Sequence, residues 1–305
     1  MARGQNQQSS VRYAIRGVPA ASPPACPGVY RFLDHDGKAL YIGKSVNMRS
    51  RVRSHLSISG QGERQRRLVR ATAVIDCQPT AGEAGALLLE NLAIKRETPI
   101  FNRRQRAMRR MWSIVLDESP TGYLRPEFTC FSLDNPDLRG AYGSFASRYH
   151  ARKALTWLAR TETLCPRILD LERGRGPCFQ RQLGRCHGAC EGVESAARHN
   201  HRLHNALVSH RLSIWPVAGP VLLCERESSP TPGQPAEAWH LLHNWMYLGT
   251  YESAEEARES RCCEGFLFDR DTYRILRGIL RQERVQLYCR DTLAPIDWPG
   301  SAPAL

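Results

Sequence analysis

The sequence has 305 residues, of which 42% are hydrophobic and 24% charged, and these ordinary values indicate neither a disordered nor a fibrous chain. A formal net charge of +13 predicts a polyanionic partner, and the excess is concentrated between positions 44 and 110, where fifteen Lys and Arg residues face five acidic residues. No apolar run is long enough to span a membrane, so nucleic acid is expected rather than a membrane.

Residues 1–25 predict a flexible lead-in, because they are polar at first and then rich in Ala, Pro and Ser. They lack the continuous apolar core of a secretory signal, so we expect a cytoplasmic protein. In that reducing compartment the eleven cysteines would be free, and clustered cysteines would indicate a metal site or catalysis rather than disulfides.

Residues 26–106 predict a small domain with a three-stranded antiparallel sheet and helices. GVYRFL and ALYIG are rich in aromatic and branched residues and are separated by DHDGK, whose Asp-Gly pair is typical of a tight turn, so together they predict a β-hairpin. Apolar spacing predicts a helix over about 46–56, ATAVIDCQ a third strand, and AGEAGALLLENLAIK a helix over about 82–95.

The remaining chain predicts two further parts of an α+β protein. Residues 107–212 hold strands at MWSIVLDE and FTCFSL, an amphipathic helix at SRYHARKALTWLARTE, and then a cysteine-rich segment. Residues 213–305 predict a C-terminal α+β module in which strands alternate with a helix at SAEEARES. Trp239, Trp245 and Tyr247 fit either a strand core or base stacking, and Asp269 and Asp271 are interpreted as surface carboxylates at alternate strand positions.

The first domain contains the side chains that phosphodiester hydrolysis needs. Such a hydrolase must position a water molecule and neutralise charge on the phosphate, usually with a divalent metal on a carboxylate. GVY at 28–30 and YIG at 41–43 resemble the two halves of the GIY-YIG endonuclease signature, with Val in place of Ile. Arg51, Glu90 and Asn102 follow at the distances of that family's arginine, metal-binding glutamate and asparagine.

The resemblance implies a metal-dependent DNA endonuclease in which Glu90 binds Mg²⁺ or Mn²⁺ and Tyr41 is the general base toward the attacking water. Lys44, Arg51 and the cation would favour the ionised form of Tyr41, and Arg51 would face the scissile phosphate. Tyr30 would hydrogen-bond in the same pocket, and Asn102 would maintain its geometry. The expected catalytic set is Tyr30, Tyr41, Lys44, Arg51, His55, Glu90 and Asn102.

Two residues near this set have open interpretations. His55 departs from the UvrC pattern, in which a tyrosine usually stands four residues after the arginine; it is either a phosphate donor or proton carrier, or a helix-surface residue. Glu83 is interpreted as a helix-capping residue rather than a metal ligand. Basic side chains expected at DNA phosphates are Lys44, Arg49, Arg51, Arg53, Arg103, Arg104, Arg106, Arg109 and Arg110.

A second set consists of Cys165, Cys178, Cys186 and Cys190, with twelve, seven and three residues between them. The surrounding segment resembles the cysteine-rich region that follows the nuclease domain of UvrC. The resemblance implies an iron-sulfur cluster, although four thiolates would also hold zinc. The alternative is four buried, reduced cysteines.

From residue 27 to 280 the chain resembles short excinucleases homologous to UvrC. The resemblance implies incision on the 3' side of a lesion in nucleotide excision repair, by a monomer that acts on damaged double-stranded DNA with UvrB, downstream of UvrA. One alternative is a GIY-YIG nuclease with its own sequence or structure specificity. Another is a catalytically silent DNA-binding iron-sulfur module.

Overall fold

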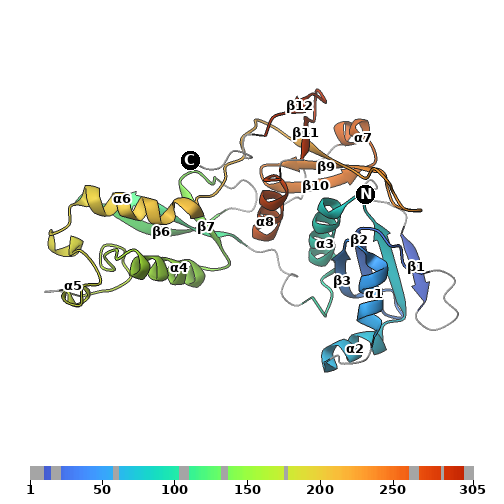
Figure 1. Ribbon diagram of the computed structural model, residues 1–305, viewed down its shortest axis with the longest axis horizontal. Coiled ribbons are helices and arrows are strands. Elements are labelled where there is room, and N and C mark those ends of the chain that lie inside the picture. The colour runs from blue at the N-terminus through green and yellow to red at the C-terminus, as the bar shows by residue number, and fades with distance from the viewer. Residues whose placement is uncertain are drawn as a thin grey trace. The chain divides into compact units, whose positions relative to one another are not determined.

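The computed structural model describes residues 10–14, 22–57, 62–102, 110–131, 137–174, 178–260, 268–282 and 285–298 (Figure 1). The chain divides into two compact units. Unit 1 comprises Met1–Met108, Trp215–Leu267 and Asp271–Leu305, and unit 2 comprises Arg109–Ile214 and Phe268–Arg270. Unit 2 is thus inserted, in sequence, between two parts of unit 1. None of the described helices combines the length and the apolar composition needed to cross a membrane.

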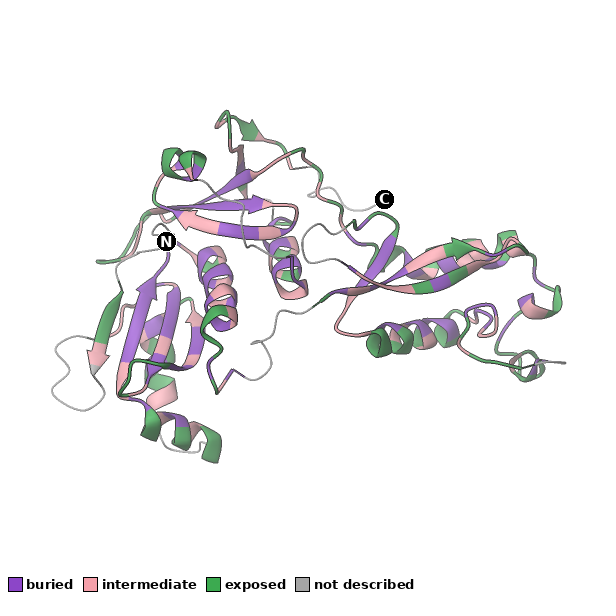
Figure 2. Cartoon of the chain, turned by 180° about the vertical axis from the view of Figure 1, so that it is seen from behind, coloured by how far each residue is buried: buried purple, intermediate pink, exposed green. Residues whose placement is uncertain are grey.

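The first sheet of unit 1 is antiparallel, and its strand order is β1-β4-β2-β3. Its strands are β1 (Val11–Ala14), β2 (Gly28–Leu33), β3 (Ala39–Ser45) and β4 (Val74–Pro79). The two central strands, β2 and β4, are almost wholly buried (Figure 2). The predicted hairpin and third strand are confirmed, but the sheet has four strands rather than three.

The fourth strand corrects the expectation of a wholly flexible lead-in. Residues 11–14 pair with β4, from Val11 opposite Cys77 to Ala14 opposite Val74. Val and Tyr in VRYA favour an extended chain, and Arg12 lies 3.8 Å from Asp76. The strand was missed because its four residues are too few to establish a period-2 pattern.

The hairpin turn forms as its Asp-Gly pair predicts. The Oδ1 atom of Asp34 accepts hydrogen bonds from the backbone N–H groups of Asp36 at 3.1 Å and Lys38 at 2.8 Å. Gly37 has φ = 75°, a left-handed conformation that glycine adopts without steric cost. The turn sets β2 against β3 so that Tyr30 lies opposite Gly43.

Three helices complete this part of unit 1: α1 (Met48–Leu56), α2 (Glu63–Ala71) and α3 (Glu83–Glu97). One buried cluster joins Tyr30 and Phe32 to Met48 and Val52 of α1 and Leu68 of α2. A second cluster, on the other side of β2, joins Val29, Leu33, Ala39 and Ile42 to Leu89, Ala93 and Ile94 of α3. The alternation of side chains along β2 therefore directs α1 and α2 to one face of the sheet and α3 to the other.

The C-terminal part of unit 1 is a five-stranded antiparallel sheet of order β10-β9-β8-β11-β12. Its elements are β8 (Val221–Arg226), β9 (Glu237–His243), β10 (Met246–Tyr251), α7 (Ala254–Glu259), α8 (Arg270–Ile279), β11 (Gln286–Cys289) and β12 (Pro295–Ile296). Trp239, Trp245 and Tyr247 are buried, which favours the core over base stacking. Asp269 and Asp271 flank the first residue of α8, so the strand expected there is a helix, and Asp269 is buried rather than a surface carboxylate.

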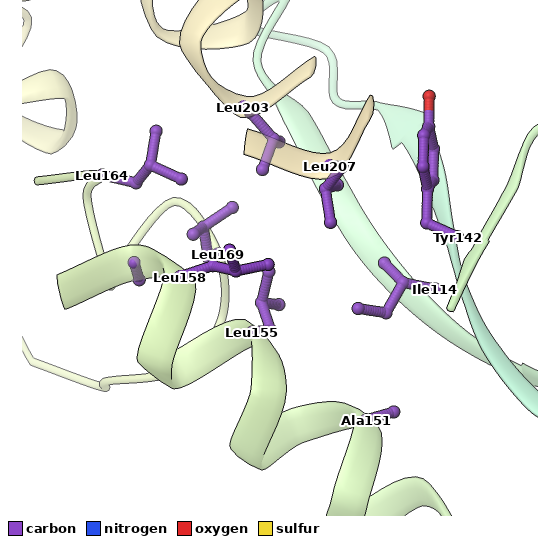
Figure 3. Close-up of a cluster of buried hydrophobic side chains, with 10 residues drawn as sticks. Ile114, Tyr142, Ala151, Leu155, Leu158, Leu164, Leu169, Leu203 and Leu207 are labelled. Atoms are coloured by element: carbon purple, nitrogen blue, oxygen red, sulfur yellow. The ribbon is translucent and has the colours of Figure 1, made fainter. Parts of the chain in front are cut away.

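Unit 2 has a three-stranded antiparallel sheet of order β6-β5-β7. Its elements are β5 (Trp112–Glu118), β6 (Leu124–Cys130), β7 (Ala141–Phe145), α4 (Arg148–Thr161), α5 (Phe179–Gln182), η1 (Ala189–Glu191), α6 (Ala196–Leu207) and η2 (Val208–His210). Ile114, Leu155 and Leu203 meet in its core, where α4 and α6 pack on the sheet (Figure 3). The amphipathic pattern predicted for α4 is confirmed.

Candidate active site

The two glycines of the signature make room for the side chains around them. A Cβ atom on Gly43 would overlap the hydroxyl of Tyr30, which stands opposite it on β2. A Cβ atom on Gly28 would overlap the carbonyl oxygen of Gln78 and the side chain of Met48. Alanine at position 43 would therefore push the Tyr30 side chain aside, and alanine at position 28 would push β2 away from Gln78 of β4 and Met48 of α1.

Tyr30 is 1% exposed, and its hydroxyl lies 3.0 Å from Nε2 of His55. The Nδ1 atom of that imidazole lies 3.0 Å from Nε2 of Gln65, which is also 3.1 Å from the backbone carbonyl oxygen of His55. A carbonyl oxygen only accepts hydrogen bonds, so the Gln65 amide must present its nitrogen here. His55 therefore accepts at Nδ1 and carries its proton on Nε2, from which it donates to Tyr30.

The Tyr30 hydroxyl has two further partners. It accepts a hydrogen bond from the guanidinium of Arg51 and donates one to the phenol of Tyr41. Burial raises the pKa of Tyr30 well above its usual value, so this hydroxyl keeps its proton. Tyr30 thus links His55 and Arg51 to Tyr41, and the single hydroxyl proton points toward Tyr41.

Tyr41 lies at the wall of a pocket of about 360 Å³ lined by Tyr41, His55, Gly62, Arg64, Gln65, Leu68 and Phe101. Burial, followed by the negative charge of Glu90, raises the pKa of the Tyr41 phenol. The hydrogen bond from Tyr30 and the charges of Arg51 and Arg64 act in the opposite direction. Arg51 lowers the pKa of Tyr41 as expected, but burial raises this pKa by more.

Glu90 reaches the open edge of β3 from α3. Its Oε1 atom accepts the backbone N–H of Lys44 at 3.0 Å, and no described residue donates to its Oε2 atom. Burial raises the pKa of this carboxyl group, while the N–H and charge of Lys44 and the charge of Arg51 lower it. The ammonium of Lys44 turns instead to Glu83, 2.5 Å away, so Lys44 contributes its backbone to Glu90 and its side chain to the start of α3.

Asn102 is buried and pairs with the same edge of β3. Its Oδ1 accepts the N–H of Ile42 at 2.9 Å and its Nδ2 donates to the Ile42 carbonyl at 2.8 Å. The N–H of Phe101 donates to the Leu40 carbonyl at 2.9 Å. Residues 101–102 therefore satisfy part of an edge that would otherwise be unpaired.

The basic residues expected at DNA have different surroundings. Arg51 and Arg53 are exposed on α1. Arg49 is half-buried, and its Nε donates to the Pro23 carbonyl at 2.8 Å, so it anchors the entry to α1. Arg110 is exposed in unit 2, whereas Arg103, Arg104, Arg106 and Arg109 lie outside the described residues.

Helix α2 and its site residues were not predicted from the sequence. Gln65 fixes the tautomer of His55, and Arg64 donates to the Phe101 carbonyl at 2.5 Å. The segment ERQRRLVRA contains strong helix formers, which was the available signal for the helix. No signal in the sequence identified Gln65, because a glutamine on a charged helix usually faces solvent.

The four cysteines of the second set come together in unit 2. Cys165, Cys178 and Cys186 are buried in one cluster, and Cys190 is partly buried against it. Burial raises the pKa of Cys186 to about 11, and burial with the neighbouring thiols of Cys165 and Cys178 raises that of Cys190 to about 12. Among the described residues, no group of three or more His, Cys, Asp and Glu side chains is arranged to hold a metal ion.

Three family models match successive parts of the chain. The UvrC-like GIY-YIG domain matches residues 26–103, the middle domain of UvrC/Cho excinucleases matches residues 114–209, and the C-terminal domain of excinuclease Cho matches residues 220–293. These matches cover most of the chain. They confirm the resemblance to short excinucleases homologous to UvrC that the sequence suggested.

Individual relatives agree with these matches. Excinuclease Cho of Escherichia coli strain K12 is 40% identical over 258 residues, which cover 83% of this chain and 82% of that protein. UvrABC system protein C of Methylococcus capsulatus is 31% identical over 190 residues, 62% of this chain and 30% of that protein. The crystal structure of the GIY-YIG N-terminal endonuclease domain of Thermotoga maritima UvrC, bound to magnesium as its catalytic divalent cation, is 32% identical and covers 26% of this chain and 86% of that domain, with a TM-score of 0.25.

Proposed function

The chain belongs to the Cho family of UvrC-like excinucleases, and we propose that it cuts damaged double-stranded DNA on the 3' side of a lesion during nucleotide excision repair. Membership makes it a GIY-YIG endonuclease, a hydrolase of phosphodiester bonds in DNA. The proposed partners are UvrB and, upstream of it, UvrA, and the proposed location is the cytoplasm, where bacterial DNA lies. We propose that the enzyme acts as a monomer.

The observation that carries this proposal is the convergence of Tyr30, Tyr41, Arg51 and Glu90 at one end of β3. Two strands and two helices supply these side chains, and no hydrophobic core requires a buried tyrosine, an arginine and a glutamate to meet. The arrangement speaks against a catalytically silent module. The family matches to residues 114–209 and 220–293 speak against a GIY-YIG nuclease with its own sequence or structure specificity.

Glu90 suits a magnesium or manganese ion. Its half-buried carboxylate is held through Oε1 by the Lys44 backbone, and Oε2 is left to bind a cation. Magnesium keeps several waters and takes phosphate oxygens, so one carboxylate is sufficient. When bound, the cation would withdraw charge from the phosphate and offset the effect of Glu90 on the pKa of Tyr41.

Hydrolysis requires a base for the attacking water, and Tyr41 is the proposed base. In its ionised form the Tyr41 oxygen accepts a proton from the water as the water oxygen bonds to phosphorus, and the ester oxygen departs with the bonding electrons of its P–O bond and takes a proton from solvent. The hydrogen bond from Tyr30 stabilises the phenolate of Tyr41, and Tyr30 is itself held by His55 and Arg51. Arg51 is exposed, so its guanidinium can also donate to a phosphate oxygen.

For DNA binding we propose the exposed Arg51, Arg53 and Arg110, together with the run from Arg103 to Arg109. Lys44 and Arg49 are assigned supporting roles, because their side chains contact Glu83 and Pro23. At Cys165, Cys178, Cys186 and Cys190 we propose an iron-sulfur cluster, with zinc as the alternative. The support for this proposal is that the four thiols gather in one largely buried cluster.

A test of the nuclease site compares the protein with Glu90→Ala on a duplex that carries one defined lesion. With magnesium, UvrA and UvrB present, the protein should cut on the 3' side and leave an undamaged duplex intact. Glu90→Ala should lower the rate by at least about a hundredfold while the affinity for DNA changes little, because only the cation site is lost.

Glu97→Ala is the matched control, since Glu97 lies on the same helix and pairs with Arg31. Equal cutting by Glu90→Ala and the wild type would refute the metal assignment. Cutting of bare duplex at one sequence, independent of the lesion, would refute the proposed repair role.

A further inference from the structure

Helix α3, which carries Glu90, begins without a capping side chain of its own. Residue Gly82 stands at its N-cap position and offers no side-chain acceptor. The first N–H groups of a helix have no partner within the helix, and the helix dipole places partial positive charge there. Some other group must satisfy the N–H donor of Gly85, since this residue is buried.

That group is the carboxylate of Glu225 on β8, in the C-terminal part of unit 1. Its Oε1 accepts the N–H of Ala84 at 2.8 Å, and its Oε2 accepts the N–H of Gly85 at 2.9 Å. Burial opposes ionisation of Glu225, but His240 and these two N–H groups outweigh it and lower the pKa of the carboxyl group. A charged residue 140 positions away in the sequence thus caps the helix.

The start of α3 has the shape this cap requires. A Cβ atom on Gly82 would overlap Oε1 of Glu225, and one on Gly85 would lie 2.9 Å from Oε2 of Glu225 and 3.0 Å from Cε1 of His240. Glycine costs a helix interior about 1 kcal/mol relative to alanine, so Gly85 is not explained by helix propensity. It is explained by the close approach of the carboxylate.

Glu225 is itself held by a chain of hydrogen bonds. Nε2 of His240 lies 3.2 Å from Oε2 of Glu225, and Nδ1 of His240 lies 2.7 Å from the hydroxyl of Thr250. That hydroxyl lies 2.6 Å from the hydroxyl of Tyr247. A carboxylate only accepts, so His240 donates through Nε2, and its remaining partner Thr250 orients the ring.

The same face of α3 makes further contacts with this region. Nδ2 of Asn91 donates to the hydroxyl of Thr272 on α8 at 2.9 Å, and Lys95 lies 3.9 Å from Asp271. In Figure 1, α3 lies between the β2–β3 hairpin and α8. Because Leu88, Leu89, Ala93 and Ile94 are all buried, the helix is apolar on both sides, as expected of a helix enclosed between two layers.

We propose that Glu225 is a positioning residue for the nuclease, and that the C-terminal part of unit 1 serves to hold α3 so that Glu90 meets the edge of β3 in the geometry a cation needs. Glu90 lies five positions after Gly85, about 7.5 Å along the helix. Lys44 holds the start of the same helix from the other side, through Glu83. This inference rests on the proposed function of Glu90 as the cation ligand.

The test uses the full-length protein with Glu225→Ala and, separately, Gly85→Ala. We expect both variants to need about tenfold more magnesium for half-maximal incision, as changes to groups that orient metal ligands commonly do, with unchanged affinity for DNA. Amide hydrogen exchange at residues 84–86 should become faster while exchange in β2 and β4 stays at the wild-type rate. Gly85→Ala is the more diagnostic of the two. Alanine is a better helix former than glycine, so this variant should weaken the start of α3 only if the close approach of the Glu225 carboxylate matters.

Two control variants match these changes. Gly278→Ala places the same methyl group in α8, where no described side chain or other element lies within 4 Å of it, and Glu237→Gln removes a charge from the neighbouring strand β9. Both should keep the wild-type magnesium dependence. Wild-type magnesium dependence in Glu225→Ala, or unchanged exchange at residues 84–86, would overturn the inference. An active Glu90→Ala variant would instead refute the proposed function, and the exchange measurement would still report on the cap.

Discussion

At the residue scale, His55 hydrogen-bonds to Tyr30, although its position on a charged helix is also typical of a surface residue. The sequence left it as either a functional or a surface residue, since an isolated histidine is compatible with both. Gln65 excludes the simple surface interpretation, because it fixes a neutral imidazole that donates from Nε2 to Tyr30. The identity of Gln65 as its partner could not be predicted, since the two residues lie on different helices.

Burial and the charge of Arg51 lower the pKa of His55 below its usual 6.5. The neutral ring therefore contributes its full stabilisation of the fold above pH 6.5. This contribution is lost as the pH falls through the lower pKa that His55 has in the folded protein. Protonation at Nδ1 would place a hydrogen against the amide nitrogen of Gln65. Incision by the wild type should consequently fall about tenfold for each pH unit below this pKa.

His55→Tyr replaces the titrating ring with the side chain usual in UvrC, and measured rates should then lack this acid limb. Tyr30, Tyr41, Arg51 and Gln65 also face the ring. The carboxyl group of Glu90, whose pKa burial raises, is present in both proteins. An identical acid limb in His55→Tyr would assign the titration to another group.

At the scale of elements, the hairpin and helices α1, α3, α4 and α7 could be predicted because each has a strong local pattern. GVYRFL, the Asp-Gly turn and ALYIG specify the hairpin without any distant contact. Strand β1 and helix α2 could not be predicted with equal ease. Strand β1 is defined by its pairing with β4, and α2 is so rich in arginine that it shows little apolar periodicity.

The pairing of Asn102 with the edge of β3 is a contact between elements that a single substitution can remove. Asn102→Ala removes two hydrogen bonds to Ile42. The free energy of unfolding of unit 1 should fall by about 2 kcal/mol, at roughly 1 kcal/mol for each bond, and denaturant titration would measure it. Asn205→Ala, at an exposed position of α6, is the control. A loss no larger than that of the control would mean that water replaces both bonds.

At the scale of the whole molecule, the chain leaves unit 1 near residue 108 and returns to it near residue 215. The sequence predicted three consecutive parts, and it could not show that the first and the last meet, because Glu225 and Gly85 carry no motif that links them. The expected carboxylates at Asp269 and Asp271 illustrate the same limit. Asp271 lies near Lys95 of α3, a contact that only the folded unit 1 creates.

The four cysteines give a prediction for the composition of the whole protein. Prepared without oxygen, it should contain iron and absorb visible light, and Cys186→Ser should lose both signals because one thiolate ligand is removed. Cys289→Ser, whose residue lies outside the cluster, should keep them. Metal analysis that finds zinc and no iron would replace the cluster with a zinc site.

The cap that Glu225 places on α3 also has a consequence for the order in which the protein is made. A ribosome releases the N-terminus first, so every proposed catalytic residue from Tyr30 to Asn102 emerges before β8. A nascent or broken chain that lacks Glu225 would hold the complete set of cutting side chains around an uncapped helix. Such a chain should therefore need more magnesium for incision than the whole protein, so that cutting at a low magnesium concentration would begin only after β8 has been made.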